Sequence, residues 1–172
     1  SYNQGQQAAF NSQISANSSR IGELRRQQAI LNSRYNVGSF RGDPGNGGYP
    51  NYWAYAPQDS LIDSWGMYNR ECVSYTAFKV AASGRNMPYW GGVGNANQWP
   101  ADAHNAGIAS GSTPQVHSVA ISMRGYYGHA MWVEAVGPGN TIYISQYNYD
   151  YNGHYSEMSI NGSGLTYIYF GQ

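Results

Sequence analysis

The segment of residues 129–148 constrains the fold of this 172-residue chain more than any other stretch. Two runs rich in β-branched and aromatic residues, HAMWVEAV and TIYISQYNY, flank the sequence GPGN at residues 137–140. Glycine, proline and asparagine favour a tight turn, so a β-hairpin is predicted. A loop of two or of four residues gives the same register, in which Val136 lies opposite Thr141.

This register gathers polar side chains at the end of the hairpin that lies away from the turn. Because side chains alternate between faces, His129, Gln146 and Asn148 share one face. Its full set is His129, Met131, Val133, Ala135, Ile142, Ile144, Gln146 and Asn148. His129 would face Asn148 at about 5 Å between Cβ atoms, with Gln146 on the diagonal at about 7 Å. Either amide could therefore orient the imidazole.

The only cysteine of the chain, Cys72, lies in a predicted helix within residues 64–84. Apolar side chains recur there at helical spacing, and Gly84 suits a left-handed C-cap. The spaced residues are Val73, Ala77, Val80 and Ala81. Cys72 then falls in the first turn, where unpaired N–H groups and the helix macrodipole favour a thiolate. The alternative is an inert cysteine that serves as a small buried hydrophobe.

A histidine with amides beside it is the partner that a catalytic thiol needs. We expect the His129 face of the hairpin to pack against the helix that Cys72 opens, so that the imidazole takes the thiol proton. An amide carbonyl on the other ring nitrogen would fix the tautomer. The competing interpretation is a core histidine with its hydrogen bonds satisfied.

Supporting roles fall to residues near this pair. The backbone N–H of Cys72 and a side-chain donor from Tyr68 or Asn69 would form an oxyanion hole. Trp90, Trp99 and Tyr127 are candidates to wall a groove for an extended substrate. For the two tryptophans, packing under a long loop is the alternative.

The N-terminal third differs in pattern from the rest. Residues 12–35 carry a weak heptad seam, which predicts a helix over residues 1–36 as the stump of a coiled coil with a partner or activator protein. The alternative is a polar helix that lies on the domain or frays. The glycine-rich residues 37–50 have the composition of a linker. Residues 51–172 are then predicted to form the catalytic domain.

Composition excludes several classes of function. Nine basic and nine acidic residues give a net charge of zero, and without a basic run nucleic acid is not an expected partner. The sequence contains no run of about 18 apolar residues, so no membrane span is predicted. The histidines lack metal-ligand spacing, so no metal or other cofactor is expected. A single lysine among many Gly, Tyr, Asn and Ser residues, and a polar start at Ser1, favour a mature or trimmed secreted form.

Five motifs in order resemble the CHAP family, the cysteine, histidine-dependent amidohydrolase/peptidase domains. They lie at residues 70–75, 94–96 with Trp99, 113–114 before 118–120, 128–129 and 144–149. The resemblance, over residues 53–170, implies a papain-like α+β fold with short helices packed on an antiparallel sheet. It also implies a secreted, cell-wall enzyme that cuts amide bonds in peptidoglycan, either as an endopeptidase or as an N-acetylmuramoyl-L-alanine amidase. Cys72 then matches the nucleophile, His129 the general base and Asn148 a common fourth member.

Two positions depart from the family pattern. Gln146 stands where glutamate is most frequent, and an amide can orient the imidazole but cannot stabilise an imidazolium by charge. His117 stands where relatives commonly have glycine, and we interpret it as a surface residue at the start of a strand.

Two other functions stay open on sequence grounds. One is a catalytically silent peptidoglycan-binding or scaffold module. The other is an autoinhibited enzyme in which the N-terminal helix covers the groove, as in cell-division hydrolases that carry a coiled coil ahead of this domain.

Overall fold

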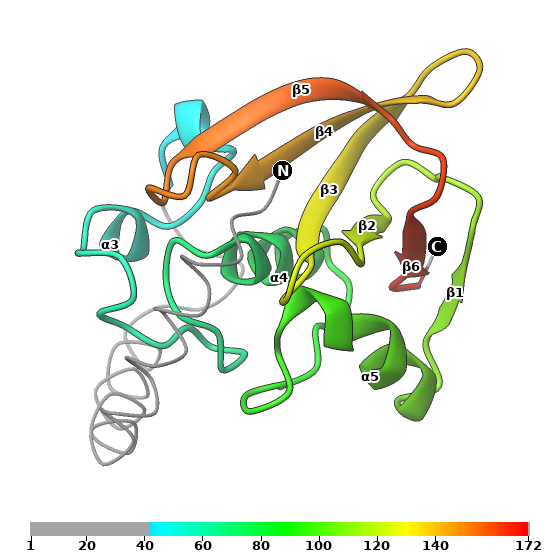
Figure 1. Cartoon of the computed structure of the whole chain (residues 1–172). Coiled ribbons are helices and arrows are strands. Elements are labelled where there is room, and N and C mark those ends of the chain that lie inside the picture. The colour runs from blue at the N-terminus through cyan, green and yellow to red at the C-terminus, as the bar shows by residue number, and fades with distance from the viewer. Residues whose placement is uncertain (1–41, 172) are drawn as a thin grey trace.

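The computed structural model describes residues 42–171 (Figure 1). They form an α+β domain whose short helices pack on an antiparallel sheet, so the predicted fold class is confirmed. The helix predicted for residues 1–36 and the first part of the predicted linker, residues 37–41, lie outside the described residues.

The helical elements precede the strands along the described chain. They are η2 (Pro44–Asn46), α3 (Asn51–Ala54), α4 (Cys72–Ala82), η3 (Ala96–Gln98) and α5 (Trp99–Asn105). The strands are β1 (Ala109–Gly111), β2 (Val119–Ser122), β3 (His129–Val136), β4 (Thr141–Tyr147), β5 (Tyr155–Asn161) and β6 (Thr166–Tyr169). They form one six-stranded sheet in the order β1-β6-β2-β3-β4-β5, in which every neighbouring pair is antiparallel.

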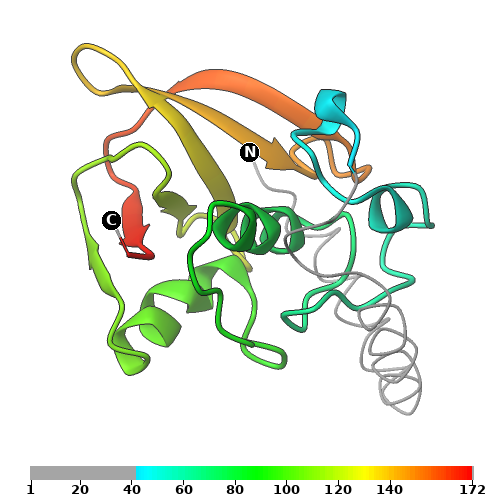
Figure 2. The same cartoon turned by 180° about the vertical axis from the view of Figure 1, so that it is seen from behind.

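Helix α4 is the element that the sequence pattern predicted. It begins at Cys72 and ends at Ala82, and the Gly84 N–H donates to the carbonyl of Ala81. Figures 1 and 2 show α4 and α5 together on one side of the sheet. Buried side chains of both helices share one apolar core with sheet residues such as Trp132 and Tyr147.

The two faces of the sheet have different cores. Against α4 lie Ala130, Trp132 and Tyr147, and Tyr75 of the helix donates a hydrogen bond to Ser145 at 2.7 Å. The other face buries a second cluster of sheet residues: Ala120, Met131, Val133, Ile142, Ile144 and Tyr167. The expectation that the His129 face packs against α4 is therefore wrong. The alternate residues carry the aromatic rings and the small side chains that fit the helix.

The register of the β3–β4 hairpin agrees with the prediction at one end only. Near the turn Val136 pairs with Ile142, because a three-residue loop lies between Gly137 and Thr141, whose N–H and carbonyl are joined at 2.9 Å. A β-bulge between Val133 and Ala135 then shifts the register by one residue. Beyond it Trp132 pairs with Ser145, as predicted.

The second half of the predicted linker is folded onto the domain. Gly42 and Pro50 form an isolated antiparallel bridge around η2. Tyr49 is fully buried, its ring lies 4.7 Å from that of Tyr147, and its hydroxyl lies 2.6 Å from Ser74 Oγ. Residues 42–50 thus contribute to the core that supports α4.

Candidate active site

Cys72 is the first residue of α4, and its reduced thiol is buried at 2% exposed. The residue before it, Glu71, is the N-cap, with extended backbone at φ −91° and ψ 158°. The peptide N–H groups of the first turn therefore lie next to the thiol. Their partial positive charge favours the thiolate form.

His129 is the first residue of β3 and is 6% exposed. Its Nε2 lies 2.8 Å from Gln146 Oε1. A carbonyl oxygen can only accept, so Nε2 carries the proton and Nδ1 is the basic nitrogen of the neutral ring. Burial lowers the pKa of His129 to about 4, and the hydrogen bond to Gln146 opposes this shift. The imidazole is therefore neutral near pH 7.

Gln146, and not Asn148, is the amide that holds the imidazole. Its own Nε2 donates to Ser156 Oγ on β5 at 3.1 Å, which fixes the orientation of the side-chain amide. Asn148 is directed elsewhere: its Nδ2 donates to Glu71 Oε1 at 2.9 Å, and its Oδ1 accepts from the N–H of Gly153 at 2.9 Å. The sequence left these two residues as alternatives.

Glu71 is the buried carboxylate of this region, at 4% exposed. Its second oxygen, Oε2, accepts from Gln58 Nε2 at 3.0 Å. Burial first, and the charge of Glu71 second, raise the pKa of neighbouring Asp59 to about 10. Asp59 is therefore protonated near pH 7, and its side chain is also hydrogen-bonded to Glu71.

The contact between Glu71 and Asn148 joins the two halves of the candidate site. Glu71 directly precedes Cys72, and Asn148 is the second residue after Gln146, the partner of His129. The segment that carries the thiol is thus hydrogen-bonded to the segment that carries the partner of the imidazole. A thiol at the start of a helix, together with an imidazole that an amide orients, can carry out nucleophilic attack on a carbonyl.

The part of the chain that carries these residues matches a known protein family. The model of the CHAP domain family matches residues 62–148, which include the nucleophile candidate, the imidazole and both amides. The chain belongs to the CHAP domain family.

Several proteins of Staphylococcus aureus resemble the chain. The probable autolysin LDP of strain NCTC 8325 / PS 47 is 35% identical over 100 residues, which is 57% of this chain and 35% of that protein. The staphylococcal secretory antigen SsaA of the same strain is 32% identical over 79 residues, 46% of this chain and 29% of that protein. The chain thus spans about a third of the length of these relatives.

A solved structure shares the fold. The crystal structure of an N-acetylmuramoyl-L-alanine amidase from Staphylococcus aureus superposes with a TM-score of 0.54 at 26% identity. The match covers 60% of this chain and 31% of that one. The similarity supports the α+β arrangement described above.

Two CHAP motifs support the start of β3. Gly128 has φ 71°, and a Cβ there would lie 2.7 Å from the carbonyl oxygen of Ser122 and 2.8 Å from the N atom of Asn97. This close approach lets the Asn97 N–H donate to the carbonyl of Tyr127 at 2.9 Å. In the other motif Asn95 caps η3 in a capping box with Gln98. Both motifs hold the backbone that carries His129.

The tryptophans predicted to wall a groove are core residues. Trp99 is fully buried, and its Nε1 donates to the carbonyl of Gly94 at 3.0 Å. Trp90 is 7% exposed and packs edge-on against Trp99 at 5.2 Å. Tyr127 is 5% exposed. These rings stabilise the loop around η3, which is the alternative that the sequence had left open for the tryptophans.

The two oxyanion candidates differ in the structure. Asn69 is fully buried, and its Nδ2 donates to the carbonyls of Trp53 and Pro57 at 2.9 and 3.1 Å. Within the described residues both of its amide N–H groups are used, so Asn69 is not a donor for an oxyanion. Tyr68 is half-buried and forms an isolated bridge with Ile62.

Tyr149 is a site residue that the sequence reasoning missed. Its ring centroid lies 6.2 Å from that of His129, and the residue is 40% exposed. It directly follows Asn148 in the family motif at residues 144–149, which was the available signal. It presents an aromatic surface to solvent beside the imidazole.

The surroundings of His117 account for a histidine at this position. It is exposed, has φ 65° and stacks on Trp132 at 5.4 Å. A glycine at this position would adopt the same backbone conformation without strain. The stacking contact holds the histidine in this conformation at the start of β2.

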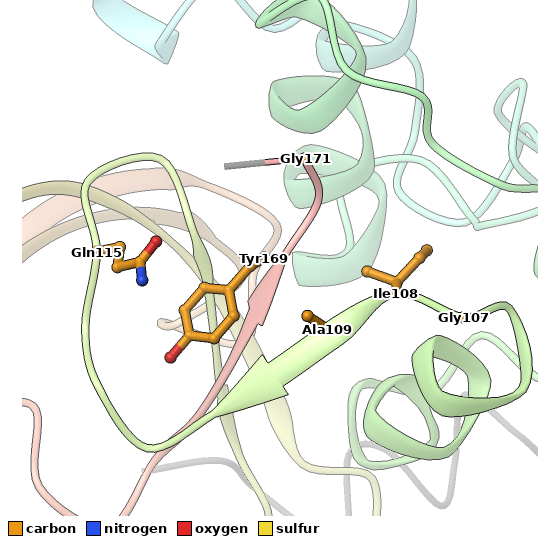
Figure 3. A pocket seen from close by; sticks show the side chains of 6 residues that line it. All are labelled: Gly107, Ile108, Ala109, Gln115, Tyr169 and Gly171. Carbon is orange, nitrogen blue, oxygen red and sulfur yellow. The ribbon is translucent and has the colours of Figure 1, made fainter.

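A surface hollow of about 420 Å³ lies away from these residues, between β1, β6 and the loop before β2 (Figure 3). Its lining residues are Gly107, Ile108, Ala109, Gln115, Tyr169 and Gly171. They include no thiol, imidazole or carboxylate. This hollow therefore lacks the groups that the reaction needs.

Two features are absent from residues 42–171. These residues contain no group of three or more His, Cys, Asp or Glu side chains that could hold a metal ion. None of their helices is long and apolar enough to cross a membrane.

Proposed function

We propose that this domain hydrolyses an amide bond of bacterial peptidoglycan, with Cys72 as nucleophile, His129 as general base and Gln146 as the residue that orients the imidazole. The observation that carries the proposal is the buried 2.8 Å contact between His129 Nε2 and Gln146 Oε1, in a family whose model also spans Cys72. The names of the relatives, an autolysin and an amidase, support the substrate class.

The reaction has two covalent stages. In acylation, His129 Nδ1 accepts the thiol proton, Sγ of Cys72 bonds to the amide carbon, and the imidazolium returns that proton to the leaving nitrogen as the C–N bond breaks. In deacylation, water adds to the thioester carbon and gives one proton to His129. The C–S bond then breaks, and the proton returns to the thiolate.

Two features of the site suit these steps. The low pKa of His129, about 4, keeps Nδ1 unprotonated and able to accept the thiol proton near pH 7. The backbone N–H of Cys72 is the first donor for the oxyanion, and Tyr68 is the candidate for the second. Tyr149 offers its exposed ring to the substrate beside His129.

A digestion experiment tests the proposal and identifies the bond. Purified muropeptides are incubated with the wild-type protein and with Cys72→Ala, and the new termini are identified by mass spectrometry. A free L-Ala amine indicates amidase action, whereas a cut between amino acids indicates an endopeptidase. Cleavage should fall to the buffer background in Cys72→Ala and stay at the wild-type rate in Asn161→Ala, a substitution at the exposed end of β5.

The thiol can also be tested without substrate. Alkylation of Cys72 should follow a pKa well below the free-cysteine value of about 8.5. A value near 8.5, or full cleavage by Cys72→Ala, would contradict the enzyme and favour a silent binding module.

The N-terminal segment carries a separate proposal that rests on sequence alone. Residues 12–35 would contact a coiled-coil or activator protein, and residues 51–172 would form the catalytic part of a secreted protein at the cell wall. If the segment inhibits the site, deletion of residues 1–41 should raise the cleavage rate. This deletion leaves Tyr49 in its core position. An unchanged rate would contradict inhibition.

A further inference from the structure

We propose that Glu71 and Asn148 form a latch that sets the position of the Cys72 thiol relative to the His129 imidazole. In this role both are positioning residues, and Asn148 does not contact the imidazole or the substrate. The inference rests on the proposed function of the same site. It assigns a task to Glu71, which lies in the motif at residues 70–75 but had no predicted role, and a different task to Asn148.

The carboxylate of Glu71 is used in an unusual way for an N-cap. A side chain at this position commonly accepts an N–H of its own helix, but Glu71 makes no such hydrogen bond in α4. Its two oxygens accept from Asn148 at 2.9 Å and from Gln58 at 3.0 Å. A buried charge is costly unless it is hydrogen-bonded. These two contacts therefore hold Glu71, the residue directly before Cys72, in place.

Two hydrogen bonds and its backbone conformation fix the position of Asn148. Its backbone N–H donates to the carbonyl of His154 at 3.0 Å, its Oδ1 accepts from Gly153, and its φ is 62°. Asparagine and aspartate tolerate this left-handed conformation better than other non-glycine residues. The side chain is 2% exposed, and its remaining group, Nδ2, points at Glu71.

The latch therefore connects the start of α4 to the end of β4. Helix α4 also contacts the sheet further along its length, through apolar residues such as Phe78 and through the hydrogen bond from Tyr75 to Ser145. Tyr75 lies three residues beyond Cys72, whereas the charge-assisted hydrogen bond of Glu71 acts on the residue directly before the thiol and so sets the position of the helix start. A misplacement of about 1 Å at a reacting atom can cost about 100-fold in rate.

A charge-swap experiment separates this role from a direct catalytic one. In Asn148→Asp two carboxylates face each other across the latch, so kcat should fall about 10- to 100-fold with little change in KM. In the double variant Glu71→Gln with Asn148→Asp, the new glutamine N–H donates to the new carboxylate. The glutamine oxygen still accepts from Gln58, and the aspartate still accepts from Gly153. The double variant should therefore recover most of the lost kcat.

The rescue is the decisive result. If Asn148 acted on the imidazole or the substrate through its own N–H groups, the double variant would be as slow as Asn148→Asp alone, and that result would overturn the latch. Glu71→Gln alone keeps the contact to Gln58 but places an amide N–H against Asn148 Nδ2–H, so it should also lower kcat. If Asn148→Asp fails to fold, Glu71→Gln and the double variant give the same comparison. Asn161→Ala is the matched control and should keep the wild-type kcat.

Alkylation of Cys72 distinguishes failure of the latch from failure of the enzyme proposal. The pH profile of alkylation needs no substrate, and it should shift in Asn148→Asp and return in the double variant. A profile that is the same in all variants would overturn the latch even if muropeptides are cleaved. Absence of cleavage by the wild type, with the shift and rescue present, would overturn the proposed substrate and leave the latch standing.

Discussion

The two ends of the β3–β4 hairpin are built in different ways. At the site end, His129, Gln146 and Asn148 are each at most 6% exposed, and each side chain has a hydrogen-bonded partner. At the turn end, Val136 and Tyr143 are 43% and 38% exposed, and a bulge interrupts the ladder. The same two strands therefore carry a fixed end and an adaptable end.

The difference shows where the register of a hairpin is decided. A slip of one residue would move Gln146 to the other face, away from His129, and leave buried polar groups unsatisfied. The exposed end has no such constraint, so it absorbs the extra residue of the three-residue loop in the bulge. The burial of polar partners, and not the turn, fixes the alignment that the chemistry needs.

The largest effect is expected when the fixed end loses its amide. Gln146→Leu keeps the approximate volume but removes the acceptor for His129 Nε2–H. The imidazole then loses its fixed tautomer, and kcat/KM should fall about 100-fold. Steady-state cleavage of a defined muropeptide measures it.

Tyr143→Phe is the matched control at the adaptable end. It removes the hydroxyl that donates to Glu157 at 2.5 Å, on the same strand as Gln146. Cleavage should stay within about twofold of wild type, since exposed hydrogen bonds contribute little. Equal losses in the two variants would contradict the contrast between the ends.

The next effect comes from two glycines, Gly128 directly before β3 and Gly139 in the turn between β3 and β4. Gly128→Ala puts a Cβ against two backbone atoms at 2.7 and 2.8 Å, in a positive-φ conformation. We expect a loss of roughly 2–4 kcal/mol in the free energy of unfolding and about tenfold in kcat, because His129 must shift. Gly139→Ala, at φ 64° with open space around the Cβ, should cost only about 1 kcal/mol.

Urea unfolding and steady-state kinetics on both variants check this pair. Gly139→Ala should retain the wild-type kcat, since the turn does not hold the site. A kcat for Gly139→Ala as low as that for Gly128→Ala would show that the turn end also controls the imidazole.

The sequence predicted the local structure around the candidate site better than the way its elements pack together. The helix start at Cys72 and the alignment at the site end follow from periodicity, which is a local property. The face that packs against α4 was wrong, because both faces of the hairpin are apolar and both are buried. Alternation alone cannot choose between two buried faces.

Residues far apart in the chain account for what the sequence could not show. Glu71 and Asn148 meet only because α4 and β4 are packed side by side, and no spacing within either motif encodes the contact. Trp90 and Trp99 lie in the core, but a sequence pattern does not distinguish a core tryptophan from one that lines a groove. Burial decides their role, and burial depends on the whole fold.

The smallest effect is expected when a negative charge is added at the fixed end of the hairpin. Gln146→Glu places a carboxylate on His129 Nε2–H, and the Ser156 hydroxyl can turn to donate to it. A carboxylate stabilises the imidazolium, so the pKa of His129 should rise from about 4 toward the ordinary value. A rise of about one unit would increase Cys72 alkylation at pH 6 up to about tenfold.

Stability gives an independent measure of the same change. In the wild type the folded pKa of His129, about 4, lies below the unfolded value of about 6.5, so the unfolded state binds more protons between these values. The contribution of this group to stability is present above pH 6.5 and is lost as the pH falls toward 4. Gln146→Glu should shrink that loss, so the urea midpoint should fall less between pH 7 and pH 5 than in the wild type. Asn140→Asp puts the same charge in the turn and should leave both the alkylation rate and the pH dependence unchanged. An equal effect from that variant would mean that net charge, and not the contact at the fixed end, governs the imidazole.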